Sequence, residues 1–369
     1  MNGGGGRGRG QKRASRNSGL RRGYTTGTCA AAAARGAALW LLEGRFPERV
    51  AILLPGGEQV TLPVHAVFRD TSAAQCCVIK DAGDDPDVTD GMAIHVRVEF
   101  AAASGVVIDG GEGVGRVTKP GLPVPVGEAA INPVPRAMIA GALAGLVPTG
   151  GGWKVTVSVP GGDNVARRTF NPRLGIAGGI SILGTSGYVE PRSLDALRRS
   201  LPPLLDVLRA SGCREVCLVP GNIGRRAARR LQPPPAEEQI VEVSDFLGFM
   251  LDEAYRRGFA RIVLVGHPGK LAKILNGDWQ THSRFAGPAN GAVIDFCAAA
   301  GLPEDLIRRL GELSTVEAIQ QALINEGYGR LLGMLASRIK VLVQERLGPG
   351  PYVAVHLCDL QGNIVGEAP

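Results

Sequence analysis

The second half of the chain repeats one hydrophobic pattern three times: a short apolar run, a glycine-rich turn and a segment of helical character. The three instances are Ile180–Gly187, Val216–Gly224 and Ile262–Lys270. Each run is rich in Ile, Val and Leu without polar alternation, which is typical of a strand buried on both faces of a parallel sheet. Glycine lets backbone amides approach a ligand, and a following helix points unpaired N–H groups at the same place. The pattern predicts a small-molecule site along one sheet edge.

Strands therefore alternate with helices from about residue 180 onward, which predicts a parallel sheet. We expect strands at Ile180–Leu183, Val216–Val219, Ile240–Val243 and Ile262–Val265, and helices at Ser193–Ala210, Ile223–Leu231, Phe246–Arg257 and Lys270–Leu275. A largely helical region, Gly291–Leu347, and a final strand, Tyr352–Leu357, complete this half.

The first half mixes strands and helices without a repeated strand–helix unit. Ala30–Leu42 is apolar nearly all round and predicts a buried helix, capped by Thr26 or Thr28. Val50–Leu54 and Val60–Val67 flank a Pro-Gly-Gly turn and predict a hairpin. Further expected elements are strands at Cys76–Lys80, Ala93–Phe100, Val106–Ile108 and Trp153–Val159, and a helix at Pro135–Leu146.

These orders of strands and helices predict a fold with two domains, of the α/β and α+β classes. An α+β domain is expected over residues 20–170, and a Rossmann-like α/β domain with a mostly parallel sheet and a helical C-terminal part over residues 171–369. Residues 1–19 form a Gly/Arg-rich tail that has almost nothing to bury and is expected to be disordered.

Composition narrows the class of protein. The chain is 44% hydrophobic and 20% charged, as in globular proteins. Residues 1–22 hold seven basic residues and no acid, which accounts for the whole net charge of +7. The tail has no aromatic residue for base stacking, so nucleic-acid binding is not favoured. No stretch reaches the roughly 18 to 20 apolar residues of a membrane span. Seven cysteines without metal-ligand spacing favour a reduced, cytoplasmic protein.

Four hydroxyl and glycine positions precede the first helix. Thr25, Thr26, Gly27 and Thr28 combine hydroxyls with helix amides and predict a cradle for a carboxylate or phosphate. Ordinary helix capping explains the same residues equally well.

Acids crowd the turn Lys80–Gly91. Asp84, Asp85 and Asp87 are candidate catalytic carboxylates that stabilise a cation or accept protons, and a polar turn is the alternative. They could also coordinate a hard cation, but they lack the regular ligand alternation and closing Glu of a calcium loop, and no metal site is assigned to them.

Basic and amide side chains lie near two further turns. Arg116 and Lys119 follow a run with four glycines, and Asn132 and Arg136 accompany two prolines. Arginine binds carboxylates through paired hydrogen bonds, and these four basic and amide residues are therefore candidates for binding an anionic substrate. A bare turn and a rigid helix entry are the alternatives.

The glycine turns after the predicted strands are candidates for holding a cofactor. The residues concerned are Gly184, Thr185, Ser186, Gly187, Gly221, Asn222, Gly224, Gly266 and Lys270. The GHPGK turn is too short for a Walker A loop. His267 within it is a candidate general base, and a turn residue is the alternative.

Six blocks in unbroken order carry a family resemblance: LRRGYTTGTCAAAAA, KDAGDDPDVTDG, GGEGVGRVTKPGL, AINPVPRAMI, TFNPRLGIAGGISILGTSGYVEP and GHPGKLAKI followed by THS. Together they resemble the cobalt-precorrin-5B methyltransferase family of the anaerobic cobalamin pathway, over about residues 20–285. The family has Ser-Asn where this chain has Ser244-Asp245.

The resemblance implies transfer of a methyl group from S-adenosylmethionine to carbon 1 of cobalt-precorrin-5B, giving cobalt-precorrin-6A. It implies a tetrapyrrole substrate, with cobalt present only as part of that substrate. The state of oligomerisation stays open. A phosphate- or nucleotide-binding protein that uses the GHPGK turn is the alternative function.

Overall fold

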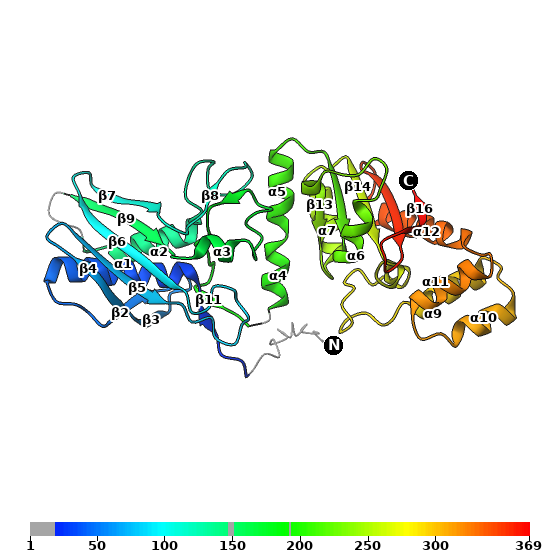
Figure 1. The fold of residues 1–369 in the computed structure, drawn as a ribbon, viewed down its shortest axis with the longest axis horizontal. Coiled ribbons are helices and arrows are strands. Elements are labelled where there is room, and N and C mark those ends of the chain that lie inside the picture. The colour runs from blue at the N-terminus through cyan, green and yellow to red at the C-terminus, as the bar shows by residue number, and fades with distance from the viewer. Residues whose placement is uncertain (1–18, 147–150, 192) are drawn as a thin grey trace, which may run out of the picture. The chain divides into compact units, whose positions relative to one another are not determined.

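The computed structural model describes residues 19–146, 151–191 and 193–369 (Figure 1). The expected disordered tail lies, except for Gly19, outside these residues. The chain forms two compact units, each built from three stretches. The N-terminal unit comprises the chain up to Val114, Ile131–Arg168 and Ile180–Ser193, and the C-terminal unit comprises Gly115–Ala130, Thr169–Gly179 and Leu194–Pro369.

The N-terminal unit is built on a five-stranded sheet of order β4-β5-β6-β9-β7. Neighbouring strands are antiparallel except β7, which runs parallel to β9. A separate hairpin, β2–β3, and helices α1 and α2 complete its main elements. The bounds are α1 Thr26–Glu43, β2 Arg49–Leu53, β3 Gln59–Pro63, β4 His65–Arg69, β5 Ala73–Ile79, β6 Ala93–Ala101, β7 Gly105–Gly110, α2 Pro133–Leu143, β9 Gly152–Ser158 and α3 Gly162–Ala166.

Helix α1 is the buried element predicted from its run of alanines. It packs against β5, β6 and α2, and its small side chains let these neighbours approach closely. The N-cap is Thr25, so the prediction of Thr26 or Thr28 is wrong. Both of these residues lie inside the first helical turn. Gly44 ends the helix in the left-handed conformation, with φ 74°.

The C-terminal unit contains a second five-stranded sheet, of order β13-β12-β14-β15-β16. The first four strands are parallel, and β16 is antiparallel to β15. The strands are β12 Glu215–Val219, β13 Ile240–Glu242, β14 Arg261–Gly266, β15 Tyr352–Cys358 and β16 Ile364–Ala368. The helices are α4 Leu194–Ser200, α5 Pro202–Ala210, α6 Asn222–Ala228, α7 Leu247–Arg256, α8 Pro268–Leu271, α9 Asn290–Ala299, α10 Glu304–Gly311, α11 Val316–Asn325 and α12 Arg330–Leu347, with 3-10 turns η1 Glu237–Gln239 and η2 Ala272–Asn276.

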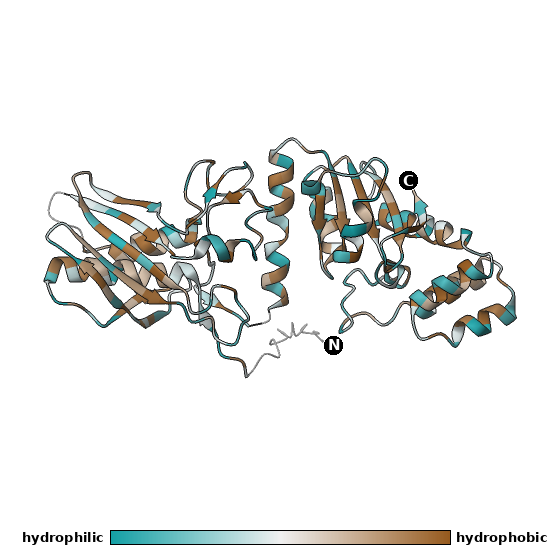
Figure 2. Cartoon of the chain, viewed as in Figure 1, coloured by the Kyte–Doolittle hydropathy of each residue, from teal (hydrophilic) through white to brown (hydrophobic). Residues whose placement is uncertain are grey.

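Successive residues of this sheet face different helices. Val216 and Leu218 of β12 join the core formed with α5 and α7, whereas Cys217 and Val219 pack with α6. Both faces are therefore buried, which is why these strands lack polar alternation. Figure 2 shows the strands of this sheet as largely brown.

Two short strand pairs join pieces of chain that are far apart in sequence. Strand β1 (Gly23–Tyr24) pairs with β11 (Tyr188–Val189) in the N-terminal unit. Strand β8 (Arg116–Val117) pairs with β10 (Ile176–Ala177) in the C-terminal unit.

The prediction of a strand at Ile180–Leu183 is wrong. This segment makes only isolated bridges, from Ile180 to Val114 and from Ile182 to Ile131, and it belongs to the N-terminal unit. Ile180 and Ile182 are buried, so their apolar character reflects a core position outside any sheet. An apolar run this short does not by itself distinguish the two cases.

Smaller differences have local causes. The helix expected over Ser193–Ala210 breaks at Leu201, because two prolines that follow lack the N–H that would continue α4. The expected strand Val60–Val67 is divided at Val64 between β3 and β4. The helix expected at Lys270–Leu275 is split into α8 and η2, and β16 was not predicted.

The structure is a mixed α/β protein, as the alternation of strands and helices predicted. In the described part of the chain, none of the helices has the length and apolar character needed to cross a membrane.

Close packing between β16 and α12 gives a stability test. At Gly366 an added Cβ would lie 2.4 Å from the backbone carbon and oxygen of Leu332. We expect Gly366→Ala to lower the free energy of unfolding by about 1–3 kcal/mol, because neither backbone can move aside cheaply. Urea denaturation measures the change.

Gly333, on the facing helix, is the matched control. Its added Cβ would make only an ordinary contact, at 3.8 Å. Alanine also favours helix, so Gly333→Ala should be neutral or stabilising by up to about 1 kcal/mol. Equal losses in the two variants would contradict the packing argument.

Candidate functional site

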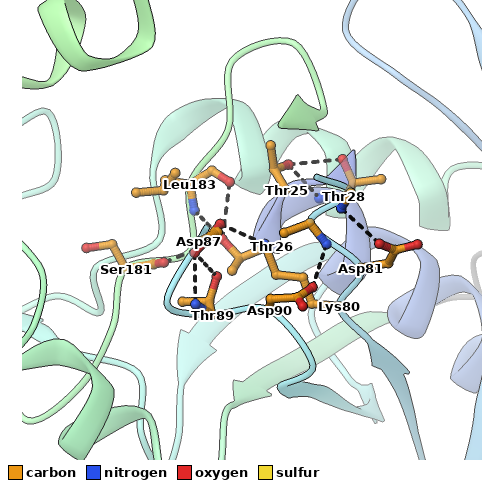
Figure 3. A network of polar contacts seen from close by, with 12 residues as sticks. Thr25, Thr26, Thr28, Lys80, Asp81, Asp87, Thr89, Asp90, Ser181 and Leu183 are labelled. Carbon is orange, nitrogen blue, oxygen red and sulfur yellow. Dashed lines mark hydrogen bonds and ion pairs between the residues drawn. The ribbon is translucent and has the colours of Figure 1, made fainter. Parts of the chain in front are cut away.

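The N-terminus of α1 is tied to the segment Ser181–Gly187 by the hydroxyls of Thr26 and Thr28, and Figure 3 shows Thr26 beside Ser181 and Leu183. Thr28 Oγ1 donates to the carbonyl of Gly187 at 2.7 Å, and Thr25 Oγ1 accepts from Thr28 N at 3.3 Å. Thr26 Oγ1 accepts from Leu183 N at 2.9 Å and lies 3.2 Å from Leu183 O. All three side chains are buried. The hydroxyls predicted to cradle an anion thus have protein partners, and substrate binding by them stays a prediction.

Glycines make this close approach feasible. An added Cβ at Gly27 would lie 2.8 Å from Pro135 Cγ. Gly184 has φ +139°, and its Cβ would lie 2.3 Å from Thr25 Oγ1. Gly187 has φ +89° and borders Thr28. The glycines predicted to contact a cofactor therefore also have a packing reason to be glycine.

The acidic turn begins with a buried ion pair. Lys80, whose side chain is 1% exposed, donates to Asp87 Oδ2 at 2.7 Å. Thr89 donates to Asp87 Oδ1 from both N and Oγ1, at 2.8 and 2.7 Å. Burial of the Asp87 carboxyl acts to raise its pKa, but the Lys80 hydrogen bond and charge, with the Thr89 bonds, bring the pKa below its usual value. Asp87 is therefore an anion already matched by a cation.

Other acids of the turn face the chain that precedes α1. The hydrogen bond from Arg21 is the main cause that lowers the pKa of Asp81, to which the Arg21 guanidinium is paired. Arg21 N donates to Asp84 Oδ2 at 2.6 Å. Asp84 is exposed, and Asp85 beside it is half-buried. Two carboxylates of the turn thus have cationic partners, Asp81 with Arg21 and Asp87 with Lys80.

Asn132 and Arg136 belong to the same unit. Asn132 is the N-cap of α2, and its N–H donates to Ile182 O at 3.0 Å. Arg136 donates from Nε to Ile131 O at 2.9 Å and from a terminal nitrogen to Ile108 O at 3.0 Å. Arg136 thus joins the helix entry to β7, and substrate binding by Arg136 stays a prediction.

Arg116 and Lys119 lie in the C-terminal unit instead. Arg116 begins β8 and donates to Gly127 O at 3.2 Å. Lys119 lies 3.7 Å from Glu238. The predicted substrate-binding residues are therefore distributed over both units.

The turns after β12 and β14 lie side by side in the C-terminal unit. An added Cβ at Gly224 would be 2.5 Å from Val265 O, and one at Gly266 would be 3.1 Å from Pro220. The sheet order places β12 between β13 and β14. After β12 the chain continues to β13 on one side, and after β14 it continues to β15 on the other side. Open α/β sheets bind ligands in the crevice at such a point.

Gly221, Asn222, Gly224, Gly266 and Lys270 are thus brought to one sheet edge. The glycine turn Gly184–Gly187 belongs to the other unit, so the expected single row of three turns is wrong. A cofactor-binding role for that turn, including Thr185 and Ser186, stays a prediction.

His267 and Lys270 are both held by acids. Both ring nitrogens of His267 have partners: Nδ1 accepts from Gly269 N at 3.0 Å, and Nε2 lies 2.8 Å from Glu317 Oε2. Lys270 is paired with Asp245. His267 can therefore act as a base only if it exchanges one of these partners for a substrate.

Sequence reasoning missed three polar residues of this sheet edge. They are Asp245, Glu317 and Thr281, whose hydroxyl donates to Asp245 at 3.2 Å. Asp245 follows the predicted strand Ile240–Val243, and that position was the available signal. Glu317 lies 50 residues from His267, and nothing in the sequence pointed to this pair.

The seven cysteines are free and largely buried. Within the described residues, no group of three or more His, Cys, Asp or Glu could hold a metal ion. Burial raises the pKa of the Cys29 and Cys217 thiols to about 12, so these cysteines are poor nucleophiles. Of the seven free cysteines, only Cys213 is partly exposed.

These features define the class as a mixed α/β protein. The CbiD family profile matches residues 13–191, and the profile of the CbiD C-terminal domain matches residues 280–369. The chain belongs to the CbiD family, and it is a methyltransferase.

Curated relatives span nearly the whole chain. A Moorella thermoacetica protein is 47% identical over 94% of this chain and 95% of its own length. A Thermoanaerobacter protein is 41% identical over 95% of each. Both are named cobalt-precorrin-5B C(1)-methyltransferase. A crystal structure of the Archaeoglobus fulgidus cobalamin biosynthesis protein (cbiD) is 31% identical over 72% of this chain and 84% of that chain, with a TM-score of 0.38.

The tie between α1 and Gly187 can be tested by removing one hydroxyl. We expect Thr28→Val to lower the free energy of unfolding by about 0.5–1.5 kcal/mol, because the buried Gly187 carbonyl loses one of its two donors and keeps only Thr25 N. Thr61→Val, at an exposed position of β3, should change stability by less than about 0.5 kcal/mol. Chemical denaturation measures both, and equal effects would contradict the prediction.

The Lys80–Asp87 pair gives a second test. Asp87→Asn leaves the buried ammonium uncompensated and should cost about 3–5 kcal/mol at neutral pH. Because the folded pKa of Asp87 is lowered, its contribution is present above the unfolded pKa and is lost as pH falls through the folded pKa. The stability difference from wild type should therefore shrink in acid, as measured by denaturation at a series of pH values.

The matched control removes both charges. Lys80→Met combined with Asp87→Asn should recover at least half of the loss, because no unpaired charge remains buried. A double variant as unstable as Asp87→Asn alone would argue against the ion pair.

Proposed function

We propose that this enzyme transfers a methyl group from S-adenosylmethionine to carbon 1 of cobalt-precorrin-5B and so forms cobalt-precorrin-6A. The observation that carries this proposal is the 47% identity over 94% of the chain to a relative of that name. The cobalt enters as part of the substrate. The absence of disulfides among the seven cysteines fits a reaction in a reducing cytoplasm.

We place the methyl donor at the carboxyl ends of β12 and β14, in a Rossmann-like crevice. Gly221, Asn222 and Gly224 form one wall, and Gly266 and Lys270 the other. The start of α6 supplies backbone amides that suit the donor's carboxylate. Two observations support this placement: the divergence of the chain at these two strands, and the open space beside Gly221.

The macrocycle carries carboxylate side chains, and the candidate partners are basic or rich in hydroxyls and amides. Each unit by itself offers such candidates: the Thr25–Thr28 turn, Asn132 and Arg136 in the N-terminal unit, and Arg116 and Lys119 in the C-terminal unit. Guanidinium and ammonium groups form charge-assisted hydrogen bonds with carboxylates.

Methyl transfer is an in-line displacement. The electron pair of the ring carbon forms the new C–C bond, the C–S bond breaks, and its electrons remain on sulfur as S-adenosylhomocysteine leaves. The step depends chiefly on alignment of carbon, methyl and sulfur. Positive charge then develops on the macrocycle, and carboxylates stabilise it.

We assign this charge-stabilising role to Asp84 and Asp85, because the charge of Asp87 is already compensated by Lys80. Asp87 then acts by holding the shape of the turn. His267 would join proton transfer only after releasing Glu317 or Gly269.

The phosphate-binding alternative finds less support. Lys270, the cation of the GHPGK turn, is paired with Asp245. Helix α8 spans four residues, too short for a substantial helix dipole.

The function is tested by incubating the enzyme with methyl-labelled S-adenosylmethionine and cobalt-precorrin-5B and measuring the mass of the corrinoid. We expect one labelled methyl group per corrinoid, located at carbon 1. An unchanged corrinoid mass with folded enzyme would refute the proposal.

Substitution of Gly221 tests the donor site. No atom lies within 4 Å of an added Cβ there, so the fold should tolerate Gly221→Leu apart from a small capping cost. A donor in the crevice would clash with the leucine, so KM for S-adenosylmethionine should rise about tenfold or more, which corresponds to about 1.4 kcal/mol. KM for the corrinoid should change by less than a factor of about two.

Gly291→Leu is the control, because Gly291 also lies at the start of a helix with open space around it. It should leave both KM values unchanged. An unchanged KM for S-adenosylmethionine in Gly221→Leu would contradict a donor site beside Gly221.

A further inference from the structure

The C-terminal unit contains a pocket of about 520 Å³ beside the edge strand β13. It is lined by α5 and the turn after it, by Ala236–Val241, and by residues of the stretches 115–130 and 169–179. The pocket lies near the start of β13 and before β12, as Gln239 and Cys213 in its wall indicate. The glycine turns follow the carboxyl ends of β12 and β14, and none of their glycines lines this pocket, although Arg225, next to Gly224, does.

The floor of the pocket is apolar. Leu204 and Leu208 of α5 line it with Val241 of β13, which shares their core, and with Ile240, which belongs to the core on the other face of the sheet. All four belong mainly to the core and are at most 6% exposed. A ligand therefore meets a firm hydrocarbon surface, which suits methylene groups or the edge of a ring system.

The part of the pocket wall that comes from residues 115–130 and 169–179 is held by close backbone contacts and hydrogen bonds. Gly121 has φ +105°, and an added Cβ would lie 2.5 Å from Asp206 O in α5. Thr118 donates to Gly175 O from N at 2.7 Å and from Oγ1 at 2.8 Å. This wall is thus fixed before any ligand arrives, which lowers the entropy cost of binding.

Two cationic side chains line the pocket, and each forms an ion pair with a glutamate near the surface. The Lys119 side chain is 36% exposed and lies 3.7 Å from Glu238. The Arg173 side chain is 40% exposed and lies 3.2 Å from Glu242. Exposed pairs of this kind contribute little, so a ligand carboxylate can replace either acid at low cost.

A third cation has an unused donor. The side chain of Arg225 is only 13% exposed and pairs with Glu237 at 2.7 Å. Its Nε is buried and has no acceptor among the described residues. A buried donor without an acceptor is costly, and an acceptor oxygen on a ligand would remove this cost.

We propose that this pocket binds a carboxylate-bearing arm of the macrocycle. Its hydrocarbon part rests on Leu204 and Leu208, and its carboxylate is bound by Arg173 and Lys119, within reach of the lining cation Arg225. This inference rests on the proposed function for the identity of the macrocycle. It assigns the hollow to the corrinoid and not to the methyl donor.

The rate at which Cys213 is alkylated can show whether a ligand occupies the pocket, because Cys213 lines the pocket and the other six cysteines are buried. In the wild-type enzyme, alkylation of Cys213 by N-ethylmaleimide should slow at least fivefold with saturating cobalt-precorrin-5B. S-adenosylhomocysteine should change the rate less than twofold. Peptide mass analysis identifies the labelled cysteine. Protection by the corrinoid no greater than by S-adenosylhomocysteine would overturn the proposal.

Arg173→Gln tests the carboxylate contact. We expect KM for cobalt-precorrin-5B to rise about tenfold, as for loss of one charge-assisted hydrogen bond, with kcat and the donor KM within about twofold of wild type. The matched control is Arg309→Gln, which removes another exposed arginine from a surface ion pair. An unchanged corrinoid KM in Arg173→Gln, or equal changes in both variants, would overturn the proposal.

The two proposals fail in different ways. Corrinoid protection of Cys213 without methyl transfer would refute the proposed function and leave the pocket as a corrinoid site. Methyl transfer without protection would refute the pocket and leave the function intact.

Discussion

The buried N-terminus of α1 is the constraint on which the N-terminal unit depends. Amides in the first turn of a helix have no partner within it, and here they are shut away from water. The segment Leu183–Gly187 supplies acceptors: Gly27 N donates to Leu183 O at 3.1 Å, and Thr25 N donates to Gly187 O at 3.0 Å. The close approach of this segment to Thr25 needs a glycine at position 184, because an added Cβ there would lie 2.3 Å from Thr25 Oγ1. A stretch that the apolar pattern assigned to a parallel sheet is thereby bound to the first helix instead.

Electrostatics add a second layer around that helix end. Lys80 is buried with Asp87 as its counter-ion, so the acidic turn is organised by a cation that precedes it in sequence. Asp84 is exposed and Asp85 is half-buried. Carboxylates of one turn therefore differ in burial and in partners although the residue type is the same, and such differences set the pKa of a carboxyl group.

The C-terminal unit follows a different rule, in which the order of strands in the sheet decides where ligands can bind. Because β12 lies between β13 and β14, the turns after β12 and β14 meet at one edge. The acids that hold His267 and Lys270 come from other parts of the chain and complete a polar surface there. The pocket beside β13 is lined by α5, by Ala236–Val241 and by residues of the stretches 115–130 and 169–179.

The sequence by itself determined the elements whose burial is continuous: the alanine-rich α1, the apolar strands β12, β14 and β15, and the glycine turns that follow the first two. Local pattern suffices there, because period and turn residues report directly on burial and backbone conformation. Only the tertiary structure decided where Ile180–Gly187 packs, which acid neutralises Lys80, and that Glu317 reaches His267. Those outcomes depend on hydrogen bonds and ion pairs between residues far apart in the chain, and such pairs leave no periodic signal in a single sequence.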